Sequence, residues 1–225
     1  MRKSRVAGLL FLATVALAQH QQSVEITSEP SHHLVLQNEY VRVFDVTVAP
    51  HATTLVHKHN HDYLFVTLGD SDVVSVRPGE KPVALKLKDG EVRFTPGNFA
   101  HAAINQADRP FHNTTIELLK SSSNVKQFQL AEGEALTSHG ETAAAADQWR
   151  AWINFLQPRA RMTPRGPALF VPVSDLDLRQ DGSKAVRRAI GDVMWIAPGT
   201  SYTVSNGSQP GKFFLLQFNP EPSKP

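Results

Sequence analysis

Residues 90–105 read GEVRFTPGNFAHAAIN. Two short runs in this stretch, Val92–Thr95 and Ala102–Asn105, fit β-strands, and the Pro-Gly pair between them fits a turn. Further runs of this kind lie between glycines and prolines from residue 40 to residue 118: Tyr40–Val48, Tyr63–Leu68, Val73–Val76, Val83–Leu87 and Thr114–Leu118. Many short strands joined by regular turns predict an all-β fold, an antiparallel sandwich or barrel.

The second half of the chain repeats this stretch imperfectly. Residues 191–199 read GDVMWIAPG and match residues 90–97 with one extra residue. Earlier in each half, Tyr63–Asp70 (YLFVTLGD) is matched by Ala168–Asp175 (ALFVPVSD). Because the matches occur in the same order, we interpret the chain as two β units related by duplication.

The boundary between the two units is expected in a polar stretch that contains a Ser-Ser-Ser run and an alanine-rich segment. We predict an N-terminal domain over residues 31–120, a linker over residues 121–147 and a second unit over residues 148–222. The alanines at 143–146 favour a short helix. The repeat confines that helix to the residues before Trp149.

Residues 1–18, MRKSRVAGLLFLATVALA, have the three parts of a secretory signal peptide: a basic start, an apolar run and small residues before a cleavage point. Cleavage is expected after Ala18. The apolar run, Val6–Leu17, is shorter than the roughly 20 residues that span a bilayer, which argues against an uncleaved anchor. The leader therefore predicts a periplasmic or secreted protein with no membrane attachment after cleavage.

The net charge of +2 has its origin in this leader, which holds Arg2, Lys3 and Arg5. The rest of the chain has 20 basic and 21 acidic residues, a net charge of −1. Since neither sign dominates, we expect neither a nucleic acid nor a charged membrane surface as partner. The chain has no cysteine, which excludes thiolate ligands, so any metal ion must be bound through nitrogen and oxygen.

The densest group of metal-binding side chains lies in residues 57–63, HKHNHDY. In an extended segment alternate side chains share one face, so His57 and His59 can bind the same ion. His101, on an expected neighbouring antiparallel strand, can complete the set, and we interpret His61 as a solvated neighbour. Imidazole suits several transition metals, so the expected cofactor is a divalent metal ion: zinc, iron, manganese, nickel or copper.

These residues resemble the two motifs of the cupin superfamily. The first motif, a Gly, a His-x-His pair, an acidic ligand and a later Gly, is matched by residues 57–69. The second motif, a Gly, a Pro, another Gly, a ligand His and an Asn, is matched at Gly90, Pro96, His101 and Asn105. Two family glycines are missing from their usual places. His51 stands where the first motif opens, and Gly97 comes one residue early, with Asn98 in the usual place.

The resemblance covers about Leu34–Leu119 and implies a double-stranded β-helix, a jelly-roll barrel, with the metal inside the mouth of the N-terminal barrel. Together with the repeat it implies a bicupin, two cupin-like units in tandem. A homodimer is a further expectation from the same resemblance. In the second unit Met162 and Pro164 take the places of His57 and His59, so this unit is predicted to be degenerate and structural.

Two residues compete for the acidic-ligand position of the first motif. Tyr63 occupies the usual place, four residues after His59, whereas the family's spacing to Gly69 selects Asp62. On a regular strand Asp62 would point away from the histidines, so its ligation requires a bulge or turn after His59. We favour Asp62 as the fourth ligand; the alternative is three histidines and water.

The predicted metal ligands are His57, His59, Asp62 and His101. The cupin resemblance implies a metal-dependent enzyme of the dioxygenase, isomerase or lyase type, with a small organic molecule as substrate. The alternative is a non-catalytic protein that binds a metal or a small ligand. Asn105 is expected to fix a turn or strand end. No role is assigned to the remaining histidines: His20, His32, His33, His51, His112 and His139.

Overall fold

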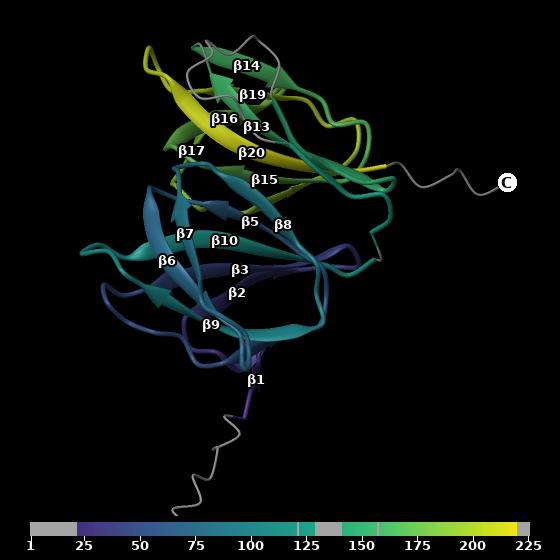
Figure 1. The fold of residues 1–225 in the computed structure, drawn as a ribbon. Coiled ribbons are helices and arrows are strands. Elements are labelled where there is room, and N and C mark those ends of the chain that lie inside the picture. Colours follow the sequence, from purple (N-terminus) through teal and green to yellow (C-terminus); the bar gives the residue numbers. More distant parts are fainter. Residues whose placement is uncertain (1–21, 121, 129–140, 157, 220–225) are drawn as a thin grey trace, which may run out of the picture.

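The computed structural model describes residues 22–120, 122–128, 141–156 and 158–219 (Figure 1). In these ranges the secondary structure consists of β-strands and one short 3-10 helix, η1 (Ile26–Ser28). The predicted all-β class is therefore confirmed. The predicted signal peptide lies outside the described residues. Within them, no helix is long and apolar enough to cross a membrane.

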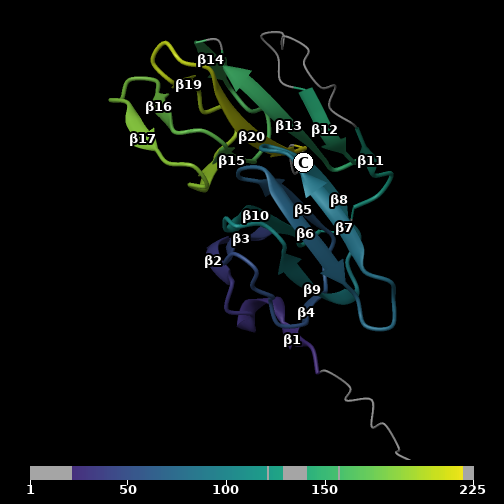
Figure 2. The same ribbon diagram turned by 60° about the vertical axis from the view of Figure 1, so that its left-hand side comes forward.

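The N-terminal half forms two five-stranded sheets that enclose a common interior (Figures 1 and 2). The first sheet has the order β1 (Val24–Glu25), β4 (His57–His59), β9 (Phe99–Asn105), β6 (Ser71–Val76) and β7 (Val83–Leu87). The second has the order β2 (His32–Gln37), β3 (Val41–Val48), β10 (Phe111–Leu118), β5 (Tyr63–Thr67) and β8 (Val92–Thr95). Every pair is antiparallel except β1 with β4. This is the predicted jelly-roll arrangement.

The C-terminal half forms two more sheets. One has the order β11 (Lys126–Gln127), β12 (Glu141–Ala145), β13 (Trp149–Leu156), β20 (Gly211–Phe218), β15 (Ala168–Pro172) and β18 (Met194–Ile196). The other has the order β14 (Arg159–Met162), β19 (Tyr202–Ser205), β16 (Leu176–Gln180) and β17 (Val186–Arg188). In Figure 1 these green to yellow strands lie above the N-terminal sheets.

The strand order of the two halves agrees. The order β2-β3-β10-β5-β8 corresponds to β12-β13-β20-β15-β18, and β4-β9-β6-β7 corresponds to β14-β19-β16-β17. The register agrees as well, because His57 pairs with His101 in one half and Met162 pairs with Tyr202 in the other. The duplication inferred from two short matches is thus supported by the strand order and by the register.

The short helix predicted over the alanines at 143–146 is wrong, because residues 141–145 form strand β12 and pair with β13. Ala143 and Ala144 are fully buried in a cluster that includes Trp149 and Ala151. Sheet pairing and burial of these small side chains outweigh a weak helix preference. Strands β11 and β12 also lie in the stretch predicted as a linker, so part of that stretch belongs to the sheet of the second half.

One apolar core joins the two halves. Leu64, Val66 and Ile116 on β5 and β10 pack in the same cluster as Leu169 and Phe214 on β15 and β20. Alternate residues of β5 and β10 face the other way, into the N-terminal barrel, since side chains alternate between the faces of a strand. The second sheet therefore has one face on this shared core and one face on the barrel interior.

Two positions where the resemblance expects glycine have a left-handed backbone. His51 has φ +57° and Asn98 has φ +62°. Glycine adopts such angles without steric cost, and asparagine and histidine adopt them more readily than most other residues. The left-handed turns of both motifs are therefore present although neither position holds a glycine. Gly97 is required for another reason: a Cβ atom there would lie 2.4 Å from the backbone carbonyl of His61.

Candidate metal centre

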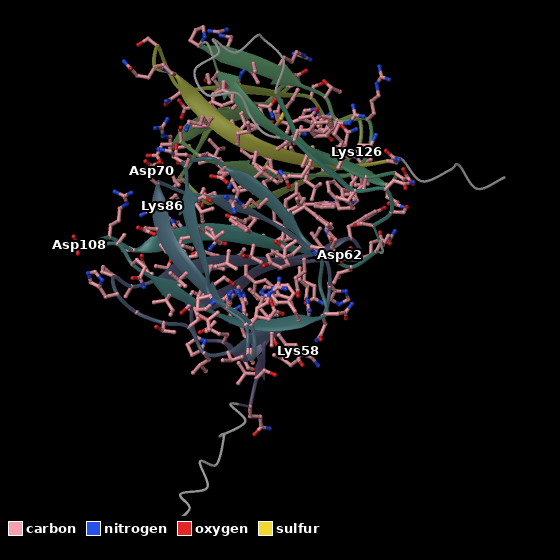
Figure 3. All side chains as sticks on the ribbon, in the orientation of Figure 1. Lys58, Asp62, Asp70, Lys86, Asp108 and Lys126 are labelled. Carbon is pink, nitrogen blue, oxygen red and sulfur yellow. The ribbon has the colours of Figure 1, made fainter. Side chains whose placement is uncertain are left out.

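Two neighbouring antiparallel strands bring three histidines together. On β4 the side chains of His57 and His59 are buried, whereas Lys58 between them is exposed and points outward (Figure 3). On β9, His101 is the direct partner of His57 in the register of the two strands. The alternation of the His-x-His pair and the neighbouring position of His101 confirm the arrangement predicted from the sequence.

One ring nitrogen from each of His57, His59 and His101 can be chosen so that the three lie within 4.8 Å of one another. The Nε2 atoms of His59 and His101 are 3.2 Å apart. Two nitrogens bound to one ion at about 2.1 Å would be separated by about 3.0 Å at a right angle and about 3.4 Å at a tetrahedral angle. The observed separation therefore fits two ligands of a single ion.

Hydrogen bonds orient two of the rings. His57 donates from Nδ1–H to the carbonyl oxygen of Leu55 at 2.9 Å, which leaves Nε2 as the nitrogen with a free lone pair. His101 uses Nδ1 for a hydrogen bond with the hydroxyl of Ser75 at 2.8 Å, so its Nε2 is directed at His59. Nε2 of His57 and Nδ1 of His59 are buried without a hydrogen-bond partner among the described residues. Buried nitrogens without partners are uncommon, and a bound ion would satisfy the Nε2 of His57.

Burial keeps the three imidazoles neutral. Burial, followed by the charge of neighbouring His32, lowers the pKa of His57 to about 4. Burial, followed by the charges of the neighbouring histidines, lowers the pKa of His59 to about 2 and that of His101 to about 3. Neutral imidazole is the form that ligates a metal, so at neutral pH a metal need not displace protons from these rings.

A cavity of about 430 Å³ extends from the three histidines between the two N-terminal sheets. Its walls are mainly apolar and aromatic, with contributions from Phe65, Phe99 and Phe111. Cavities of this size and lining typically hold a small organic ligand. The lining residues all belong to the N-terminal half, so the described residues of the second half supply no wall of this cavity.

Comparison with known proteins assigns the family. Residues 21–143, more than half of the 225-residue chain, match the family model of the cupins. The chain belongs to the cupin family. Three solved structures, each similar over most of this chain, show how widely the fold is shared. A search of curated proteins gives no match.

The cupin shares its fold with AerE from Microcystis aeruginosa, at a TM-score of 0.61 and 10% identity over 85% of this chain and 98% of that chain. A cupin 2 conserved barrel domain protein from Leptotrichia buccalis matches with a TM-score of 0.57 and 11% identity, over 84% of this chain and 88% of that chain. Salicylate 1,2-dioxygenase from Pseudoaminobacter salicylatoxidans, in adducts with gentisate, matches with a TM-score of 0.53 and 10% identity, over 80% of this chain and 68% of that chain. At these identities the likeness concerns the fold.

This cupin departs from the family pattern at the acidic ligand. The Oδ1 atom of Asp62 accepts a hydrogen bond from the backbone N–H of Gly97 at 2.9 Å, and Asp62 is not part of the three-histidine group. Figure 3 shows Asp62 at the edge of the N-terminal sheets. Its predicted role as a ligand stays a prediction.

Tyr63, in the usual place of the acidic residue, is buried and stacks on the ring of His59, with 4.2 Å between ring centres and 17° between ring planes. Burial raises the pKa of Tyr63 to about 12, so its hydroxyl keeps its proton at neutral pH. The tyrosine therefore supplies packing against the predicted ligand His59 rather than a negative charge.

Asn105 holds the end of β9 in place. Its amide donates to the carbonyl oxygens of Val48, Ala49 and Arg109, at 3.1, 3.1 and 2.7 Å, and its oxygen accepts from the N–H of Ala107 at 3.0 Å. These contacts account for the conformation of the turn after β9. They agree with the structural role that we predicted for this residue.

His32 belongs to the same group of side chains, although no role was predicted for it from the sequence. Its ring centre lies 4.5 Å from that of His57 and 6.5 Å from that of His59, and it lines the cavity. Its Nδ1 atom is 2.6 Å from Oε2 of Glu29, which is also buried. No motif spacing connects residue 32 with residue 57; only the folding of β2 and η1 against β4 brings them together.

Proposed function

We propose that this cupin is a metal-dependent enzyme that acts on a small organic molecule. One observation carries the proposal: three neutral imidazoles, from His57, His59 and His101, converge beside a cavity of about 430 Å³. A divalent ion held by these residues would supply a Lewis acid that polarises a bound oxygen or carbonyl group. The cavity would hold the organic molecule beside it.

The number of ligands favours catalysis over a structural role for the metal. Structural metal sites are usually closed by four protein ligands, whereas catalytic sites keep a coordination position open. In the described part of the chain, the group contains three residues and no carboxylate. The open positions would therefore be available to water or to a substrate from the cavity.

Three reaction types follow from the cupin resemblance: dioxygenase, isomerase and lyase. We place the dioxygenase type first because the solved structures with this fold include a salicylate 1,2-dioxygenase. The leader supports a periplasmic or secreted location. The shared strand order of the two halves supports the interpretation as a bicupin. The homodimer rests on the cupin resemblance.

The proposal is tested by elemental analysis of the purified protein without residues 1–18. We expect about one divalent ion per chain in the wild type and loss of the ion in His59→Ala and His101→Ala. His33→Ala is the matched control, because His33 is exposed on β2, and it should keep the ion. An unchanged metal content in both site variants would refute the centre.

Activity is then screened with the metal-loaded protein. We expect oxygen uptake or turnover with phenolic or sugar-derived substrates, and its loss in His59→Ala. Retention of a ligand through purification, without turnover of any substrate class, would instead establish the alternative, a non-catalytic protein that binds a metal or a small ligand.

A further inference from the structure

One cationic side chain lies close to the three histidines. Arg77 directly follows β6 and lines the same cavity. Its guanidinium carbon is 3.9 Å from the centre of the Phe99 ring. Phe99 in turn stacks on His59, with 5.4 Å between ring centres and 24° between ring planes. Arg77 is thus separated from the proposed metal ligand by a single aromatic ring.

The guanidinium of Arg77 has little competition from acidic residues. The acidic partner that the described residues offer is Glu80, with 4.0 Å between Nη1 of Arg77 and Oε2 of Glu80. Both side chains are exposed, 38% for Arg77 and 61% for Glu80, so this pair is weak. By contrast, Arg93, the other arginine of the cavity wall, donates from Nε to Glu91 at 2.7 Å. Arg77 therefore keeps N–H donors for a ligand in the cavity.

Apart from the exposed carboxylate of Glu80, the charged groups at this end of the cavity favour an anion. Three neutral imidazoles bring no negative charge to a divalent ion, and Asp62 is bonded to the backbone of Gly97. The positive charge of Arg77 adds to the same field, because only the ring of Phe99 lies between its guanidinium and His59. Positive charges in a partly dry cavity are stabilised when an anion pairs with them.

The remaining walls specify the body of the ligand. Val73, Leu85, Leu87 and Phe111 line the cavity together with Phe99, so most of its surface is apolar. A carboxylate attached to an aromatic or aliphatic body would match both parts of the wall. Arginine is suited to the charged end, because its planar fork can make two parallel hydrogen bonds to a carboxylate.

We propose that the cavity binds a small aromatic or aliphatic carboxylate, whose carboxylate group pairs with Arg77 and whose apolar body packs on Phe99 and the neighbouring apolar walls. This inference rests on the proposed function, of which it names the substrate class. Arg77 sets the specificity by requiring a negative charge at one end of the substrate.

The test compares benzoate with benzamide, two molecules of the same shape that differ in charge. Binding to the zinc-loaded protein without residues 1–18 is measured by calorimetry at neutral pH. We expect benzoate to bind at least about tenfold more tightly than benzamide. Arg77→Gln should abolish this preference, and Arg77→Lys, which keeps the charge but loses the fork, should keep part of it. Arg93→Gln is the matched control and should leave the preference within about twofold.

The same samples separate this inference from the proposed function. Metal content is measured for each preparation, and the metal-free protein is titrated in parallel. A preference for benzoate that depends on Arg77 in a protein that binds no metal would refute the metal centre and support the anion site. A metal-loaded protein that binds benzoate and benzamide equally, or one in which Arg77→Gln and Arg77→Lys both keep the full preference, would overturn the inference. Loss of the preference for benzoate in Arg93→Gln, with the preference kept in Arg77→Gln, would also overturn the inference.

Discussion

Replacement of Glu29 by glutamine tests how the ring of His57 is held for metal binding. The carboxylate of Glu29 is 3% exposed and accepts hydrogen bonds from three donors: Ser31 N at 2.8 Å, His32 Nδ1 at 2.6 Å and Leu55 N at 3.2 Å. The carbonyl of Leu55 accepts the Nδ1–H of His57 at 2.9 Å. Glu29 thus orients His57 through the backbone of Leu55 and supports it through the packed ring of His32.

The magnitude follows from what glutamine cannot do. Although burial raises the pKa of Glu29, the hydrogen bond and charge of His32 and the two backbone N–H groups lower it below its ordinary value, so the group is ionised at neutral pH. In Glu29→Gln one oxygen becomes an NH₂ group that faces a donor, and at least one buried N–H loses its acceptor. We expect a loss of about 1–3 kcal/mol in the free energy of unfolding and a loss of about 10- to 100-fold in metal affinity.

Metal affinity is measured by competition with a chromophoric chelator, and stability by denaturant unfolding of the metal-free protein. Glu39→Gln is the matched control, because it makes the same chemical change at an exposed position outside the cavity, and it should alter neither quantity. Metal affinity in Glu29→Gln within twofold of the wild type, in a protein that is folded, would contradict the orienting role of Glu29.

Three further predictions concern stability. The folded pKa values of His57 and His101 are lowered to about 4 and about 3, so the unfolded chain takes up protons first as the pH falls below about 6.5. The free energy of unfolding of the metal-free protein should therefore fall by about 2 kcal/mol or more between pH 7 and pH 5. Denaturant curves that coincide at the two pH values would contradict this. Glu117 is fully buried, and its Oε2 lies 2.6 Å from Nη2 of Arg42. Arg42→Met should therefore lower the free energy of unfolding by about 3–5 kcal/mol, and the double variant Arg42→Met with Glu117→Gln should recover part of that loss. Equal unfolding midpoints for the single and the double variant would contradict a buried charge. Gly97→Ala should cost about 1–3 kcal/mol, because its Cβ would meet the His61 carbonyl at 2.4 Å. Ala100→Ser, at a half-buried position of β9, is the control and should change the melting temperature little. A thermal melt of Gly97→Ala equal to that of the wild type would rule out the close contact.

Much of the N-terminal half was readable from local sequence. Strand boundaries such as Val83–Leu87 and Val92–Thr95 agree with the structure because turn residues stand at both ends of each run. The His57-x-His59 pair could be placed on one face because alternation depends only on the extended backbone. The helix at 143–146 failed because helix preference is a weak local term and β12 is held by pairing with β13.

The sequence alone determined the β class, the internal repeat and the identity of the three histidines, because each depends on spacing along one strand or on a repeated pattern. Tertiary structure decided which other residues share the site. His32, Glu29 and Arg77 are brought to His57 and His59 by strands and loops that are distant in the chain. It also decided that Asp62 bonds to Gly97, because the backbone after His59 turns against the Pro96-Gly97 turn. Side-chain neighbours across strands depend on register and sheet packing, and no single segment of the chain encodes them.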